Sequence, residues 1–350
     1  MAENNTVTYE NGELNQAYMN RLFCSTRERI AYTLKSALGG LDLGKYDIGT
    51  EIFLYKFFGL SPLSYAKATV GLGIYDMIND PLSAAIIDNM RTRWGKFKPF
   101  QYLALLPSLA IGFFLCILPM FANSRGMDAT QRLVTYMAVA YISETVGAFF
   151  GGGGYIDNVF TPNPNERTSL LVVAKFFADI KLPTQIFGIL YDLIDNGRLD
   201  MDVTRLFVVM KLTLWVITTV VNVNWIIVSR ERVPQTEKPP HPLKGFLSVF
   251  RNKPLLIYTL TDVVDGIDIG TSESLYYSDV LHFNMLTTIG GIPGSPISYL
   301  SYAWAPKFRE KYSTKSLWLM QRFSIFLSEG AFLLFGMIGG KENGMYLKRV

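Results

Sequence analysis

The chain has 350 residues, of which 49% are hydrophobic and only 18% are charged. With a mean hydropathy of +0.21, it is too apolar for an ordinary soluble domain. The net charge of +4 does not indicate a nucleic-acid partner, because the Lys and Arg residues fall in short segments between apolar runs. Cys24 and Cys116 provide no disulfide framework.

Long apolar runs are the main signal along the chain. Residues 1–30 are polar and lack the apolar core of a signal peptide, so we expect a cytoplasmic tail. Residues 102–121, 133–150 and 206–228 each approach the roughly 20 residues that cross a bilayer, and in lipid such runs form helices. About nine spans are predicted, with these approximate bounds: 31–58, 63–89, 99–121, 132–154, 169–193, 205–229, 254–281, 285–305 and 315–339.

The predicted fold class is therefore all-α, a polytopic membrane protein. Basic residues concentrate between spans two and three, six and seven, and eight and nine, which places these loops and the N-terminus in the cytoplasm of a multi-pass cell-membrane protein. After the tail, the expected domains are a six-helix bundle at 31–229, a cytoplasmic linker at 230–253 and the first three helices of a second bundle at 254–350.

Two carboxylates enter the predicted second span. Asp76 and Asp80 are four residues apart and share a helical face, which Asn79 borders. An ionised residue at bilayer depth costs about 2.5 to 3.5 kcal/mol unless it is paired, hydrated or bound to an ion. The three residues therefore indicate either a site for a cation such as Na⁺ or Li⁺, or a protonated carboxyl. The alternative is a pair of carboxylates neutralised by a basic residue on a neighbouring helix.

Around these residues the sequence resembles a known family. YDMINDP at 75–81, followed by RTRWGKFKP at 91–99, is similar to the hallmark of the glycoside-pentoside-hexuronide:cation symporters, the melibiose-carrier branch of the major facilitator superfamily. NPNERTSLLVVAKFFADI at 163–180 is a second similar segment. The resemblance implies two six-helix bundles, alternating access, and uptake of a sugar or glycoside coupled to Na⁺, Li⁺ or H⁺. With about nine of an expected twelve helices, the chain is expected to be C-terminally truncated.

The resemblance also implies roles for individual residues. Asp76, Asn79 and Asp80 stand where the family binds its coupling cation, and Lys175 stands where a basic residue contacts the sugar. No other cofactor is implied.

The sugar-binding carboxylates of the family's melibiose carrier have no counterpart here. The positions that correspond to those two carboxylates are occupied by glycine in this sequence, at Gly40 and at or near Gly151. Three intramembrane acids are candidates for a different substrate site together with Lys175: Glu144, Asp47 and Asp268. Salt bridges that make polar helices tolerable in lipid are an equally good interpretation of these charges.

The basic loop after span two has a mechanical interpretation. Arg91, Arg93 and Lys96 can contact Asp88 and helix C-termini, and thereby hold the cytoplasmic side shut in one state. Anchoring of the loop on the cytoplasmic side is the simpler interpretation. The four consecutive glycines at 151–154 favour close helix packing over approach to a ligand.

The predicted function is secondary transport of a carbohydrate-type or related anionic substrate. The alternative is a non-transporting sensor or a degenerate remnant of the same family. An enzyme is not expected, because the sequence has only two histidines and lacks nucleophile and phosphate-loop motifs. The expected partners are the substrate and the lipid bilayer, and the sequence carries no indication of an oligomeric state.

Overall fold

The computed structural model is helical and divides into two units, Met1–Ile267 and Asp268–Val350. A hairpin of β1 (Tyr9–Glu10) and β2 (Glu13–Leu14) contains the only strands among the described residues. The other described elements are helices, and the all-α prediction is confirmed. The structure describes these residues: 9–10, 13–14, 21–163, 166–167, 169–173, 182–233, 250–265, 304, 308 and 311–338.

The first predicted span is not one continuous helix. α2 (Thr26–Leu38) starts at a capping box, in which the Ser25 hydroxyl accepts from the Glu28 backbone N–H and the Glu28 carboxylate accepts from the Ser25 backbone N–H. It ends at the glycine pair after Leu38. A 3₁₀ turn, η1 (Gly44–Tyr46), and a π-helical turn, η2 (Phe53–Phe57), follow. Gly44 has φ +59°, a left-handed conformation that glycine adopts without strain, which breaks the span.

The next helices correspond to predicted spans two to four. Each starts with a local signal: a proline in the first turn of the first two, and the Asp128 side chain capping the third. The last helix tightens at the glycine run into η3 (Gly151–Tyr155) and continues as α6 (Ile156–Val159). The three helices are α3 (Pro62–Asn89), α4 (Lys98–Ser124) and α5 (Ala129–Phe150).

Later spans are described in part. α8 (Leu182–Asp195) and α9 (Val203–Val228) lie in the regions expected for spans five and six. α11 (Lys253–Asp265) covers the first half of the predicted seventh span, and α15 (Thr314–Ile338) corresponds to the ninth. The predicted eighth span, 285–305, lies outside the described residues except for Trp304.

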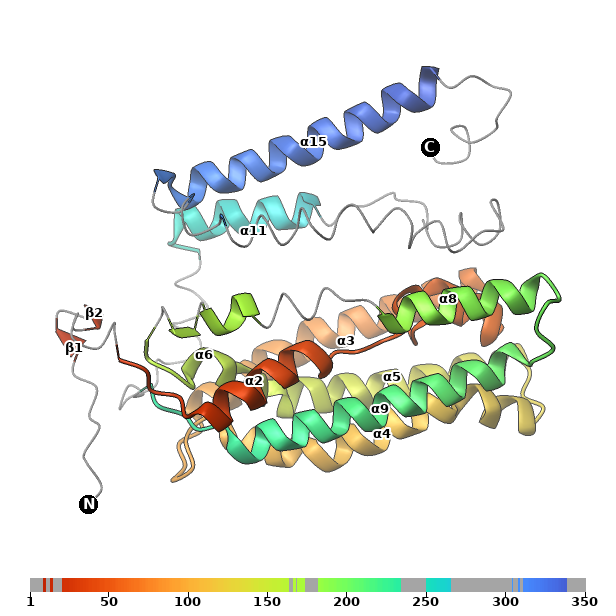
Figure 1. Ribbon diagram of the computed structural model, residues 1–350, viewed down its shortest axis with the longest axis horizontal. Helices are drawn as coiled ribbons and strands as arrows, with labels where there is room; N and C mark the ends of the chain where they lie inside the picture. The colour runs from red at the N-terminus through yellow and green to blue at the C-terminus, as the bar shows by residue number, and fades with distance from the viewer. Residues whose placement is uncertain are drawn as a thin grey trace. The chain divides into compact units, whose positions relative to one another are not determined.

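Within the first unit, α4 is the central helix. It packs against α9 on one side and against α5 and η3 on the other, while α2 packs on α9 and α3 packs on α5 (Figure 1). The crossing at η3 depends on glycine: a Cβ on Gly153 would lie 2.8 Å from the backbone nitrogen of Gln101. Close helix packing by this glycine run is what the structure shows.

Aromatic side chains fill the opposite part of the bundle. Phe53 and Phe207 pack with ring centroids 4.9 Å apart, and Tyr46 and Phe187 with centroids 4.7 Å apart. All four are fully buried. Rings at these separations contribute beyond their buried area, so this cluster fixes the irregular segment after α2 against α8 and α9.

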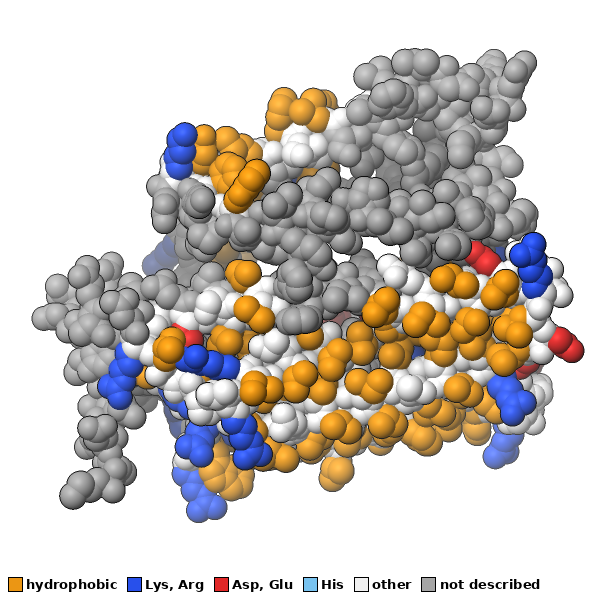
Figure 2. Space-filling model, viewed as in Figure 1, with side chains coloured by type: hydrophobic (Ala, Val, Ile, Leu, Met, Phe, Trp, Pro, Cys, Tyr) orange, Lys and Arg blue, Asp and Glu red, His pale blue; other side chains and the backbone are white. Residues whose placement is uncertain are grey.

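Three helical segments in the described part are long and apolar enough to cross a bilayer: Lys98–Ser124, Ala129–Val159 and Val203–Val228. Their mean hydropathies are 2.3, 1.4 and 2.0. Figure 2 shows hydrophobic side chains over the middle of these helices, with Lys and Arg gathered toward the two ends. An apolar band between charged ends is typical of a protein in a bilayer, and it identifies a multi-pass membrane protein.

Candidate functional site

The predicted cation site lies where α3 packs against α5. Asp76, Asn79 and Asp80 project from α3, and Glu144 lies on α5, the helix packed against it. The hydroxyls of Tyr75 and Thr145, the neighbours of Asp76 and Glu144 in the sequence, lie 2.7 Å apart. Asn79 is 3% exposed, and neither its Oδ1 nor its Nδ2 has a hydrogen-bond partner among the described residues. A buried amide without partners is costly.

The chemistry of these side chains suits a hard cation. No Lys or Arg of the described residues forms a salt bridge with Asp76, Asp80 or Glu144. The described residues also contain no group of three His, Cys, Asp or Glu side chains arranged to hold a metal ion. A cation here would therefore need amide, hydroxyl or backbone oxygens in addition to carboxylates, and such all-oxygen sets bind hard cations. Glu144, predicted from the sequence as a substrate residue, lies on α5, which packs against the helix of the two aspartates, and its role stays a prediction.

The predicted substrate residues do not form one cluster among the described residues. Asp47 follows η1 and pairs with Lys211 of α9. Glu144 lies on α5, which packs against α3, whereas the Asp47 pair involves α9. Lys175 and Asp268 lie outside the described residues.

A cavity of about 360 Å³ between α2, α4 and α9 was not predicted. Lys35 of α2 pairs with Asp157 of α6 at its wall, and the Trp225 indole N–H donates to the same aspartate at 3.2 Å. Three glycines of the run contribute backbone without side chains to the lining: Gly151, Gly153 and Gly154. The sequence carries the signal only as a lysine in the second half of α2 and an aspartate after the glycines, and 122 residues separate the pair.

The basic loop between α3 and α4 forms hydrogen bonds and an ion pair with the last residues of α3. Lys96 pairs with Asp88 at 2.6 Å, and Arg91 donates to the carbonyls of Asp88 and Met90 at the end of α3 at 2.7 and 2.8 Å. Arg93 lies over the Trp94 ring, 5.2 Å from its centroid. These contacts attach the loop to the C-terminus of α3, where positive charge is favourable.

A carboxylate from beyond α9 holds the other end of this loop. The backbone N–H groups of Lys96, Phe97 and Lys98 all donate to Glu231, at 2.9, 2.7 and 2.7 Å. Gly95 has φ +107°, and a Cβ there would lie 2.4 Å from the Glu231 carboxyl carbon. The turn before α4 is thus shaped around Glu231, which satisfies the free donors of the helix N-terminus.

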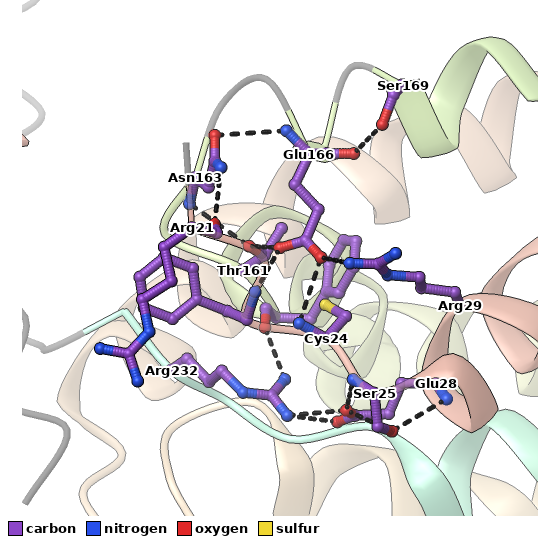
Figure 3. Close-up of polar contacts among 12 residues, drawn as sticks. Arg21, Cys24, Ser25, Glu28, Arg29, Thr161, Asn163, Glu166, Ser169 and Arg232 are labelled. Atoms are coloured by element: carbon purple, nitrogen blue, oxygen red, sulfur yellow. Dashed lines mark hydrogen bonds and ion pairs between the residues drawn. The ribbon is translucent and has the colours of Figure 1, made fainter. Parts of the chain in front are cut away.

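A buried carboxylate, Glu166, fixes the segment before α2 (Figure 3). It accepts from the backbone N–H groups of Phe23 and Cys24 at 3.0 and 3.1 Å, from Arg29 at 2.9 Å and from the Thr161 hydroxyl at 2.6 Å. Burial alone would raise the pKa of Glu166, but these bonds to the charged form outweigh it and hold the pKa below the ordinary value.

Glu28 closes the same assembly from the other side. Arg232 donates to its two carboxylate oxygens at 2.6 and 2.8 Å and to the Phe160 carbonyl at 2.8 Å. Burial opposes ionisation of Glu28, yet Arg232 and the bonds from Ser25 hold its pKa below the ordinary value. The start of α2, the α6 loop and the residues after α9 are therefore joined by two buried carboxylates.

Comparisons with known proteins agree with the fold and the motifs. The family model described as MFS/sugar transport protein matches residues 40–346. An uncharacterized symporter of Synechocystis sp. is 27% identical over 41% of this chain and 28% of its own length. An isoprimeverose transporter of Lactiplantibacillus pentosus is 25% identical over 44% of this chain and 31% of its own.

Other relatives match shorter segments. A putative glycoside/cation symporter of Escherichia coli is 28% identical over 34% of this chain and 25% of its own length. The chain thus spans less than a third of the length of these curated relatives. The family model covers most of the chain, and the resemblance to glycoside and cation symporters found in the motifs is confirmed. The chain belongs to the MFS/sugar transport protein family.

Proposed function

We propose that the protein is a secondary transporter that couples uptake of a sugar or glycoside to a cation, Na⁺, Li⁺ or H⁺. The observation that carries the proposal is the buried Asn79 amide, unpartnered among the described residues, on the same helix as Asp76 and Asp80, which packs against α5, the helix that carries Glu144. No basic side chain of the described residues pairs with these carboxylates, so a bound cation or bound protons would offset their charge.

Coupling follows from charge. With the cation bound, the carboxylates are neutralised and the two sides of the α3–α5 contact can pack closely, which shifts the population between inward- and outward-facing states. The sugar then binds to the state that the cation favours. The relatives named as an isoprimeverose transporter and a glycoside/cation symporter support a carbohydrate substrate. The same proposal includes a location in the cell membrane with a cytoplasmic N-terminus. It also includes gating of the cytoplasmic side by the charged loop residues Asp88, Arg91, Arg93 and Lys96.

The test is the thermal stability of the purified chain in detergent, measured in Na⁺, Li⁺ and choline salts and against pH. An ion that binds only the folded state at about 100 times its dissociation constant stabilises it by about 2.7 kcal/mol. We expect Na⁺, Li⁺ or acid to raise the melting midpoint of the parent and to have no such effect on Asp80→Asn.

Asp200→Asn is the matched control, because Asp200 is an exposed carboxylate in the loop before α9. It should keep the full response to the ion. If no ion or pH effect depends on Asp80, the carboxylates are structural and the symport proposal fails. If the ion response is intact but vesicles take up no labelled glycoside, the protein is a non-transporting member of the family.

A further inference from the structure

A pocket of about 330 Å³ lies where α2 begins and α9 ends, away from the α3–α5 contact. It combines arginine side chains with an apolar wall. Its lining consists of Phe23, Ser25, Arg27, Glu28, Ile227, Val228, Arg230 and Arg232.

The pocket carries an excess of positive charge. Arg232 is neutralised by Glu28 through bonds of 2.6 and 2.8 Å. Arg27 and Arg230 are exposed and form no hydrogen bond or ion pair with the described residues. One carboxylate therefore faces three guanidinium groups, and two of them are available to an incoming anion.

The position of the pocket sets the kind of anion. Val228 is the last residue of the apolar segment Val203–Val228, and Arg230 follows it by two positions. Ile227 is 63% exposed. The apolar wall thus ends where the hydrocarbon layer would end, and the free guanidinium groups begin at headgroup depth.

We propose that this pocket binds the phosphate of an anionic phospholipid, with Arg27 and Arg230 on the phosphate oxygens and the acyl chains along Ile227 and Val228. Guanidinium groups match phosphate with two parallel hydrogen bonds, and basic pockets between membrane helices are suited to anionic headgroups. The adjoining apolar wall favours a lipid over free phosphate, because it offers buried area only to a ligand that carries acyl chains.

The lipid would act on the junction after α9. Arg230 stands next to Glu231, which holds the loop before α4, and next but one to Arg232, which joins α2 to the α6 loop. An occupied pocket therefore fixes the point where three loop segments meet. This inference does not depend on which sugar or cation the protein transports.

The experiment measures the affinity of the detergent-purified chain for phosphatidylglycerol from the shift in melting midpoint, with phosphatidylcholine and inorganic phosphate in parallel. We expect saturable stabilisation by phosphatidylglycerol alone, weakened at least about tenfold in Arg27→Gln/Arg230→Gln. The control Arg125→Gln/Arg198→Gln removes two exposed charges from the loops after α4 and before α9, outside the pocket, and should bind the lipid like the parent. Arg27→Lys/Arg230→Lys keeps the charge without the fork and should bind with intermediate affinity.

Three outcomes would overturn the proposal. Equal stabilisation by inorganic phosphate and phosphatidylglycerol would make the pocket a site for free phosphate. Loss of lipid binding in the loop control as well would show a diffuse response to surface charge. Unchanged binding in Arg27→Gln/Arg230→Gln would exclude the pocket, and if that variant does not fold, the lysine variant and the two single Gln variants give the same decision.

Discussion

Replacement of Glu166 by Gln should release the segment before α2. The side chain is 1% exposed, and its two oxygens each accept two bonds: Oε1 from Cys24 and Arg29, Oε2 from Phe23 and Thr161. Gln keeps one acceptor. Its amide group can donate to the Thr161 hydroxyl but faces the Phe23 N–H, which loses its acceptor.

The expected cost is about 3 kcal/mol. A buried N–H left unsatisfied costs about 1 to 3 kcal/mol, and bonds to a charged group are worth about 1.5 to 3 kcal/mol. Loss of the ion pair to Arg29 adds less than for a fully buried pair, because the Arg29 side chain is 31% exposed and water screens it. Part of this cost is offset because the neutral Gln side chain has a smaller desolvation penalty than the ionised Glu166 carboxylate.

Hydrogen exchange resolved by peptide is the direct assay. Amides of Phe23 and Cys24 should exchange faster in Glu166→Gln, and the melting midpoint should fall by about 4 °C. Arg167→Gln is the matched control: Arg167 is adjacent, donates among the described residues to the Asn158 carbonyl on the exposed side, and its replacement should change stability by less than about 0.5 kcal/mol. Unchanged exchange at Phe23 and Cys24 in Glu166→Gln would refute the reasoning.

Two further predictions follow from the loops and the helix crossing. The pKa values of Glu28 and Glu166 lie below 4.5 in the folded state, so unfolding favours proton uptake; the stability they supply is present above about pH 4.5 and is lost as the pH falls through the folded values. Melting midpoints measured from about pH 6 down to pH 3.5 should therefore drop, and they should drop less steeply in Glu166→Gln. Parallel curves for the parent and the variant would contradict this. Gly153→Ala should destabilise the α4–η3 crossing by about 1 to 3 kcal/mol, because its Cβ would lie 2.8 Å from the Gln101 nitrogen. Gly151→Ala is the control, because its Cβ would meet nothing within 4 Å. Equal melting midpoints for the two variants would show that the helices move apart to accommodate the added methyl group.

Hydropathy and spacing were enough to predict the helical membrane architecture. The runs 102–121 and 206–228 lie within α4 and α9, because the requirement for an apolar segment of bilayer length is local to the segment. The motif at 75–81 placed Asp76, Asn79 and Asp80 on one helix for the same reason, since a four-residue spacing fixes the face. The break after Leu38 was missed because the polar residues of that span give no period to follow.

What the tertiary structure decided is the pairing of charges. Lys211 meets Asp47 across 164 residues of chain, Lys35 meets Asp157 across 122, and Arg232 meets Glu28 across 204. The sequence alone contains each charge but not its partner, because an ion pair depends on which helices pack together and at what height. Whether an intramembrane carboxylate is neutralised by a basic side chain, as Asp47 is by Lys211, is fixed only when the helices have met.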